Sequence, residues 1–244
     1  MRNLRSRIPA ACFLSIFISS HVGAVETPSK KWDESAELSI VSTNGNSKET
    51  TASAKNDFTY RWTKSSLEVV GRALGASEKD ATTAEEYFAS EELTRTLTGK
   101  NYVYEKAAWD KDRFSGVQNQ NNLSAGLGRT LLDLAKDKLI SEAGAGYVNE
   151  ERANAPRNDF GSGRAYAKYV RVLSETAKFT QDIEYLANFK DSDGYRLNTE
   201  TNLTASVSAH LYLKVSYLWK RINQPTPGFG KDTTTTSLSL VVNY

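Results

Sequence analysis

The sequence predicts an all-β protein, an antiparallel up-and-down transmembrane β-barrel of about 12 strands with short periplasmic turns and longer extracellular loops. Turn-forming segments recur about every 18 residues between residues 35 and 244, and eleven such turns imply twelve strands. Between the turns, apolar and polar side chains alternate with a period of two, which places one set in lipid and the other in a polar lumen. Only 39% of the chain is hydrophobic, which is compatible with a barrel because alternate residues avoid lipid.

The candidate turns tend to alternate in length, as expected when short periplasmic turns and longer extracellular loops follow one another. The shorter set comprises residues 61–65, 98–100, 133–138, 174–177 and the region of His210. The other set, expected at the extracellular side, comprises residues 43–47, 75–85, 110–117, 149–162, 191–194 and 223–232. No proline falls inside a proposed strand, where it would remove a ladder hydrogen bond.

The end of the chain shows the alternation most clearly. The apolar set is Leu238, Leu240, Val242 and Tyr244, and polar side chains stand between them. An outward apolar face that ends in an aromatic residue is typical of the strand that bacterial outer-membrane barrels present to the barrel assembly machinery. We therefore interpret these four residues as a C-terminal assembly signal and expect the last strand to close the barrel against the first strand around residues 36–42. Periplasmic chaperones are expected as partners in transit.

The start of the chain agrees with this location. Arg2, Arg5 and Arg7 precede a short apolar stretch and a small-residue cleavage site at residues 22–24, which predicts a signal peptide over residues 1–24. Residues 25–34 then form a periplasmic segment and residues 35–244 the barrel, in contact with outer membrane lipid. Removing the leader takes away the only cysteine, Cys12, and leaves basic and acidic side chains nearly balanced. That balance gives no support for nucleic acid as a partner.

Some strand residues are harder to place. Tyr60, Trp62, Tyr102, Trp219 and Tyr244 stand near strand ends, where outward aromatic side chains form interfacial girdles, although aromatic residues at this frequency are ordinary in any β protein. Two charged residues, Glu91 and Arg95, share a face with apolar neighbours, and either Glu105 or Lys106 must break the alternation. We expect these exceptions near a rim, where a charge on the lipid face costs little.

The strand pattern points many charged side chains into the lumen. The candidate lumen charges are Glu49, Lys55, Asp57, Arg164, Lys168, Asp182, Glu184, Arg196, Glu200, Lys214 and Lys220, joined by Glu37, Glu68, Arg72, Glu92, Glu142, Lys178 and Lys190. A barrel of twelve strands lies between small filled barrels and open porins. Because the two signs balance, we expect a constricted, ion-paired interior with weak ion selectivity. The alternative is that the charges only solvate a wet lumen.

Few side chains suited to catalysis are present, so we expect no catalytic, cofactor-binding or metal-binding residues. His210 is the one histidine outside the leader and falls in a proposed periplasmic turn without an evident nucleophile or acid beside it. Asp191 and Asp193 have the spacing of part of a calcium loop. The segment Asp-Ser-Asp-Gly is also ordinary turn chemistry, which is the interpretation we favour.

Several motifs resemble the YdiY-like family of salt-induced outer membrane proteins. They are Trp32 with residues 35–39 and 43–47, Gly126-Leu-Gly128, residues 142–147, residues 188–198, and the closing residues 215–217 and 231–236 with Pro225 and Pro227. The resemblance covers nearly the whole mature chain and implies a bacterial outer-membrane barrel. The members share a domain of unknown function, and their name implies induction by salt. Tyr244 departs from the phenylalanine that more commonly ends such barrels, but it keeps an aromatic residue there.

Three functions are compatible with these observations. The first is a narrow solute or ion pathway, linked to osmotic or envelope stress. The second is a structural or interaction barrel that supports the envelope without transport, and the third, opposed by the lack of histidine, is an outer-membrane enzyme. A soluble secreted β protein is the structural rival. The proposed strands of about 10–15 residues exceed the five or six usual in soluble sheets, which favours the membrane.

Overall fold

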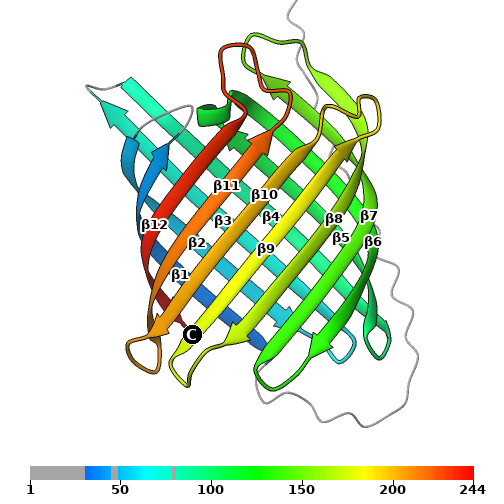
Figure 1. Cartoon of the computed structure of the whole chain (residues 1–244), viewed down its shortest axis with the longest axis vertical. Coiled ribbons are helices and arrows are strands. Elements are labelled where there is room, and N and C mark those ends of the chain that lie inside the picture. Colours follow the sequence, from blue (N-terminus) through cyan, green and yellow to red (C-terminus); the bar gives the residue numbers. More distant parts are fainter. Residues whose placement is uncertain (1–30, 45–48, 79–80) are drawn as a thin grey trace, which may run out of the picture.

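The computed structural model describes residues 31–44, 49–78 and 81–244 and shows a closed barrel of twelve antiparallel strands (Figure 1). The predicted fold class and strand number are confirmed. The strands are β1 (Trp32–Asn44), β2 (Glu49–Arg61), β3 (Ser65–Glu78), β4 (Ala81–Thr98), β5 (Asn101–Asp112), β6 (Val117–Asp133), β7 (Asp137–Arg152), β8 (Asn158–Val172), β9 (Ala177–Asn188), β10 (Arg196–Ser206), β11 (Leu211–Ile222) and β12 (Asp232–Asn243), with one 3-10 helix, η1 (Arg113–Ser115). The predicted signal peptide, residues 1–24, lies outside the described residues. In the described part of the chain, no helix is long and apolar enough to cross a membrane.

The barrel closes where its first and last strands pair. Leu38 lies opposite Leu240 and Ile40 opposite Leu238 in the register of β1 with β12. Beyond the ladder, the backbone N–H of Tyr244 donates to the carbonyl oxygen of Glu34 over 2.9 Å. The closure expected between the C-terminal strand and residues 36–42 is therefore present, and the sheet has no open edge.

Outward and inward side chains differ as the alternation predicts. Leu38 and Ile40 are 68% and 66% exposed, whereas Glu37 and Val41 on the same strand are buried in the lumen. The outward apolar set includes Val69, Leu123, Leu127, Ile183, Leu203, Leu213, Val215, Leu238 and Leu240. In a monomer in water, so large an apolar surface would be unusual. A lipid environment accounts for it.

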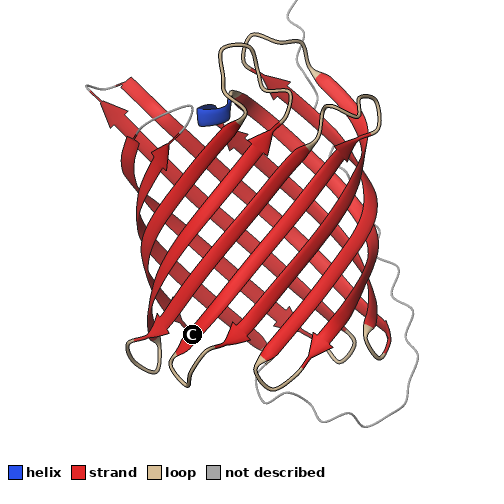
Figure 2. Ribbon diagram, viewed as in Figure 1, coloured by secondary structure: helices blue, strands red, loops and turns tan. Residues whose placement is uncertain are grey.

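Two ends of the barrel differ in their connections (Figure 2). At the short-turn end the strands are joined by residues 62–64, 99–100, 134–136, 173–176 and 207–210, and the C-terminus lies at this end. At the long-loop end the connections include residues 113–116, 153–157, 189–195 and 223–231. The expected long loop at residues 75–85 is wrong in extent, because Glu78 still pairs with Ala81 and the two strands continue as a hairpin. The loop expected at residues 149–162 is shortened for the same reason.

The outward exceptions are only partly where we expected them. Arg95 and Glu105 are exposed on the outer face near the short-turn end of β4 and β5, while Lys106 faces the lumen and pairs with Glu92. Glu91 is also exposed on the outer face, but it lies near the middle of β4, opposite Val69 and Ala107. The prediction that all exceptions lie near a rim is therefore wrong for Glu91. The alternation of side chains along β4 places Glu91 on the outer face, even though a charge there is unfavourable in lipid.

The girdle prediction also needs one correction. At the short-turn end, the rings of Tyr60 and Trp62 meet edge to face with centroids 4.8 Å apart on the outer surface, and Tyr244 is exposed there as well. Tyr102 instead points into the lumen, where its hydroxyl donates to Glu142 over 2.8 Å. Its position near a strand end did not reveal that Tyr102 faces the interior.

A charge on the outer face should be costly in the middle of a strand and nearly free at the rim. We expect Ile183→Arg, in the middle of β9, to lower the free energy of unfolding by about 2–4 kcal/mol. Leu173→Arg, in a turn at the short-turn end, serves as the matched control and should cost about 0–1 kcal/mol. Reversible denaturant unfolding in phospholipid vesicles measures both values. Equal losses would contradict the assignment of the lipid face.

Candidate functional site

The candidate site is the lumen, where strand alternation gathers charged side chains from every side of the barrel. Inward strand positions hold the candidate lumen charges whose side chains are described, except Lys190, for which the prediction is wrong because it lies exposed in the loop after β9 and donates to the carbonyl oxygen of Asp159. The side chain of Glu49 falls outside the described part of the chain. Their arrangement is not a uniform wet lining, because most of them form ion pairs in three clusters, some between neighbouring strands and some across the lumen.

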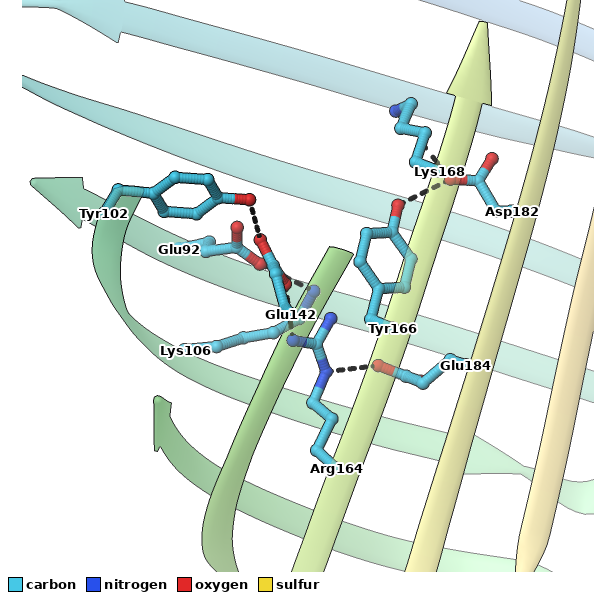
Figure 3. Close-up of polar contacts among 9 residues, drawn as sticks. All are labelled: Glu92, Tyr102, Lys106, Glu142, Arg164, Tyr166, Lys168, Asp182 and Glu184. Carbon is cyan, nitrogen blue, oxygen red and sulfur yellow. Dashed lines mark hydrogen bonds and ion pairs between the residues drawn. The ribbon is translucent and has the colours of Figure 1, made fainter. Parts of the chain in front are cut away.

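The first cluster centres on Arg164 of β8 (Figure 3). Its Nη1 donates to Glu142 of β7 over 2.7 Å and its Nε to Glu184 of β9 over 2.7 Å. The side chains of Arg164 and Glu142 are each only 1% exposed. The guanidinium also lies over the rings of Tyr104 and Tyr166, at 5.0 and 4.8 Å from their centroids. A buried cation is thus held by two carboxylates and two aromatic faces.

Glycines on β6 and β7 make room for the tyrosines of this cluster. Gly126 pairs with Gly144 across the two strands. A Cβ atom at Gly126 would come within 2.8 Å of the Tyr104 ring, and one at Gly128 within 2.2 Å of the Tyr102 ring. The tyrosines of β5 can therefore lie flat on the inner wall only because these positions lack side chains. This glycine spacing is the sequence signal that could have revealed Tyr102 and Tyr104 as luminal residues.

The same network continues toward neighbouring strands. Lys106 donates to Glu92 over 3.1 Å, and the hydroxyl of Tyr166 donates to Asp182. Lys168 lies 3.9 Å from the same Asp182 carboxylate. Figure 3 shows these groups as one belt of alternating sign that lines the wall formed by β4, β5 and β7–β9. Charges of both signs are thus compensated within the wall itself.

The second cluster joins strands β3, β4, β5 and β11. Lys220 Nζ lies 2.8 Å from Glu86 and 3.2 Å from Asp112, and Glu86 also accepts from Arg72. Asp112 in turn caps η1, because its Oδ1 accepts from the backbone N–H of Ser115 over 3.1 Å. Because Asp112 both caps η1 and pairs with Lys220, the ion pairs of this cluster help to fix the position of η1.

An apolar layer accompanies η1 at the long-loop end. Phe114 of η1 packs against Val41 of β1 and Leu74 of β3, and all three are at least 95% buried. Both strand residues face the lumen, so the phenyl ring lies inside the barrel rather than in the lipid. This contact narrows the lumen at the end where the loops lie.

The third cluster lies near the same end and surrounds Glu150 of β7, which is fully buried. Its carboxylate accepts from Arg196 of β10 and lies 2.9 Å from Arg152. Arg152 also donates to the carbonyl oxygen of Gln224 over 2.7 Å, which links β7 to the loop at residues 223–231. Sequence patterning placed Arg196 in the lumen but missed Glu150, since a carboxylate near a strand end is usually solvated.

Open space remains on the side of the lumen opposite the Arg164 cluster. A cavity of about 50 Å³ lies there, lined from β1, β2, β3, β4, β10, β11 and β12, with room for only a few water molecules. Lys214 pairs with Glu37 on this wall, and Ser39 shares a hydrogen bond of 2.7 Å with Ser239. Ion pairing therefore extends to this wall as well, beside the small cavity.

The residues weighed for metal binding and catalysis have local structural roles. Asp191 Oδ1 accepts from the backbone N–H of Asp193 over 3.0 Å, which is an ordinary turn contact. His210 is exposed in the turn between β10 and β11, and its carbonyl oxygen accepts from the N–H of Asn243. Within residues 31–44, 49–78 and 81–244, no group of three or more His, Cys, Asp or Glu side chains is arranged to hold a metal ion.

Removing the central cation of the first cluster should be costly. Arg164→Met leaves the buried Glu142 and Glu184 carboxylates without their partner, so we expect a loss of about 3–5 kcal/mol in the free energy of unfolding. The double variant Arg164→Met with Glu142→Gln should recover part of this loss, because a neutral amide replaces an unpaired charge. Denaturant unfolding in vesicles measures both.

The control for this prediction is an exposed ion pair at the rim. Arg171 lies 3.7 Å from Asp137 and its side chain is 56% exposed. Arg171→Met should therefore leave the unfolding midpoint unchanged. If Arg164→Met were as harmless as Arg171→Met, the cluster would not hold the wall together.

Comparisons with known proteins agree with the barrel. The chain is 26% identical over 188 residues to the uncharacterized protein YdiY of Escherichia coli strain K12, which covers 77% of this chain and 73% of that protein. Its fold is similar to the NanC porin, with a TM-score of 0.59 and 6% identity over 85% of this chain and 98% of that one. It is also similar to the translocator domain of the autotransporter NalP from Neisseria meningitidis, with a TM-score of 0.54 and 10% identity over 90% of each chain. These folds are outer-membrane barrels, so the short-turn end corresponds to the periplasmic side.

One family model matches most of the chain. The model of the family described as protein of unknown function, DUF481, matches residues 36–244, which is the whole barrel after its first four strand residues. The YdiY-like resemblance seen in the motifs is thereby confirmed. The chain belongs to the DUF481 family.

Proposed function

We propose that this protein is a narrow pathway for small hydrophilic solutes or ions across the bacterial outer membrane. The proposal rests on the wall of the lumen, which is lined by ion pairs such as that between Lys214 and Glu37. A cavity with room for a few water molecules lies beside this pair. A barrel that only had to fill its interior would be more stable with packed apolar side chains, because buried ion pairs repay their desolvation poorly. The similarity of the fold to the NanC porin supports a transport role.

The expected selectivity is weak. Both signs line the lumen and compensate each other in ion pairs, some within one wall and some across the lumen, so neither cations nor anions meet an excess of opposite charge. The narrow bore should exclude large solutes. A link to osmotic or envelope stress follows only from the family resemblance, and altered survival of a deletion strain at high salt would test it.

A closed structural barrel is the second candidate, and a specific contact favours it. Phe114 packs with Val41 and Leu74 inside the long-loop end, and Arg152 at the end of β7 donates to the loop at residues 223–231. If this layer never opens, the barrel supports the envelope or presents its loops without transport.

We also propose that the protein is not an enzyme. Most of the charged side chains in the lumen are held in ion pairs, and His210 lies exposed in a turn at the periplasmic end. Outer-membrane hydrolases need an activated nucleophile beside a base. The absence of lipid or peptide hydrolysis by the purified protein is the expected result, and turnover that is lost in His210→Ala would reverse this proposal.

Export and assembly complete the proposal. Residues 1–24 act as a cleaved signal peptide and residues 25–34 as a short periplasmic segment. Leu238, Leu240 and Tyr244 are exposed on the outer face of the closing strand or just beyond it, which suits recognition by the barrel assembly machinery, with periplasmic chaperones before it. Outer membrane lipid surrounds the finished barrel.

Conductance decides between the two candidates. In planar lipid bilayers we expect the full mature chain to give small, defined current steps, and Phe114→Ala to increase them by about twofold because the apolar layer narrows the lumen. Leu123→Ala, on the outer face of β6, is the control and should leave the steps unchanged. If neither the native protein nor Phe114→Ala conducts above bare lipid, the pathway proposal fails and the structural barrel stands.

Assembly provides a separate prediction. We expect Tyr244→Ala to lower the fraction of protein that migrates as a folded, heat-modifiable band after outer-membrane fractionation. Tyr244→Phe keeps an aromatic ring and should assemble normally. Normal assembly of both variants would rule out a role for this side chain as a signal.

A further inference from the structure

The cavity of the lumen has unpaired charges of both signs. It lies between β1–β3 on one side and β10–β12 on the other, and its volume of about 50 Å³ is small. A molecule of about five to eight heavy atoms, replacing a few waters, would fill it. The chemistry of its lining therefore decides which small molecule it could hold.

Most charges around the cavity already have partners. Lys214 pairs with Glu37, and Arg72 pairs with Glu86. Two lining side chains differ from these, namely Lys55 of β2 and Glu200 of β10. Within the described ranges, neither side chain takes part in an ion pair or a hydrogen bond, although Lys55 is close enough to Glu37, and Glu200 close enough to Arg72, to act electrostatically. One ammonium and one carboxylate without a direct partner thus face the same small space.

A buried hydroxyl faces the cavity as well. Ser216 of β11 is only 5% exposed, lines the cavity, and its Oγ has no hydrogen-bond partner in the protein. The Nε of Arg72, another lining residue, is also buried without a partner. An unsatisfied buried polar group costs about 1–3 kcal/mol, which binding of a polar ligand would relieve. The cavity therefore offers hydrogen bonds in addition to charge.

We propose that this cavity binds a small zwitterion, a molecule with one carboxylate and one ammonium group. Lys55 pairs with the carboxylate, Glu200 pairs with the ammonium group, and the hydroxyl of Ser216 forms a hydrogen bond to the ligand. A simple anion or cation would satisfy only one of the two free charges and would add net charge to a balanced, partly desolvated site. A zwitterion satisfies both and adds none.

This inference rests on the proposed pathway, for which it names the class of solute. Binding is measured without any need for conductance, so the two proposals can fail separately. A barrel that conducts salt but does not bind a zwitterion would overturn only this inference. A barrel that binds a zwitterion but does not conduct would overturn only the pathway.

The test uses glycine as the probe and the full mature chain folded in detergent micelles. Titration followed by nuclear magnetic resonance should show saturable binding of glycine, with acetate and methylammonium at least about tenfold weaker. Equal affinity for acetate or for methylammonium would mean a simple ion site. No saturable binding of glycine would mean that only water occupies the cavity. Either result overturns the inference.

Variants locate the binding. Lys55→Met and Glu200→Gln should each weaken glycine binding by at least about tenfold, whereas Lys138→Met, near the periplasmic end of β7 and outside the cavity, should not change it. The exchanged double variant, Lys55→Glu with Glu200→Lys, keeps both charges and should retain binding with the ligand reversed. Heat-modifiable migration confirms that each variant is folded. Unchanged binding in folded Lys55→Met and Glu200→Gln would rule out this site.

Discussion

In lipid, every backbone N–H and C=O of a strand must find a partner within the sheet, and the pairing of β1 with β12 is the contact that completes this requirement. Once the sheet is closed, each strand has one face in lipid and one in the lumen, so a residue's position in the sequence decides its environment. Leu38 and Leu240 meet on the outside, while Ser39 and Ser239 share a hydrogen bond on the inside. A shift of this register by one residue would move the apolar side chains into the lumen and the polar side chains into lipid. Closure of the barrel therefore requires the alternation of apolar and polar residues near Tyr244.

Closure also explains why the interior is ionic rather than simply wet. The charged side chains that alternation sends inward share a bore too narrow to hydrate all of them, and a charge without water needs a partner. Arg164 of β8 lies between Glu142 and Glu184 on the two adjacent strands, whereas Lys220 of β11 reaches across the lumen to Glu86 of β4 and Asp112 of β5. Some ion pairs therefore reinforce one wall of the barrel, and the Lys220 cluster crosses and narrows the lumen near the long-loop end.

Sequence patterning predicted the barrel, its twelve strands, the closing pair and the inward face of residues such as Arg164 and Lys214, because a period of two survives in nearly every strand. It could not predict which inward charges pair, since the partners of Arg164 on β7 and β9 follow from the register between strands and not from spacing along one strand. It misplaced Tyr102 because an aromatic residue near a strand end suits either face, and only the glycine opposite, Gly128, decides for the lumen. It also ended β3 too early and began β4 too late, because polar residues beyond the apolar band still form ladder pairs.

The distribution of large and small inward side chains determines where the remaining space lies. Tyr102, Tyr104 and Tyr166 cover the wall of β5 and β8, where Gly126, Gly128 and Gly144 let the two tyrosines of β5 lie flat. On the opposite wall the inward positions carry serine, and Ser39, Ser53, Ser216 and Ser237 line the cavity. The space is therefore eccentric and follows the serine wall of β1, β2, β11 and β12, next to the seam where the barrel closes. The strands that complete the backbone ladder thus also border the open space, so the register of the closing pair affects both stability and the shape of any passage.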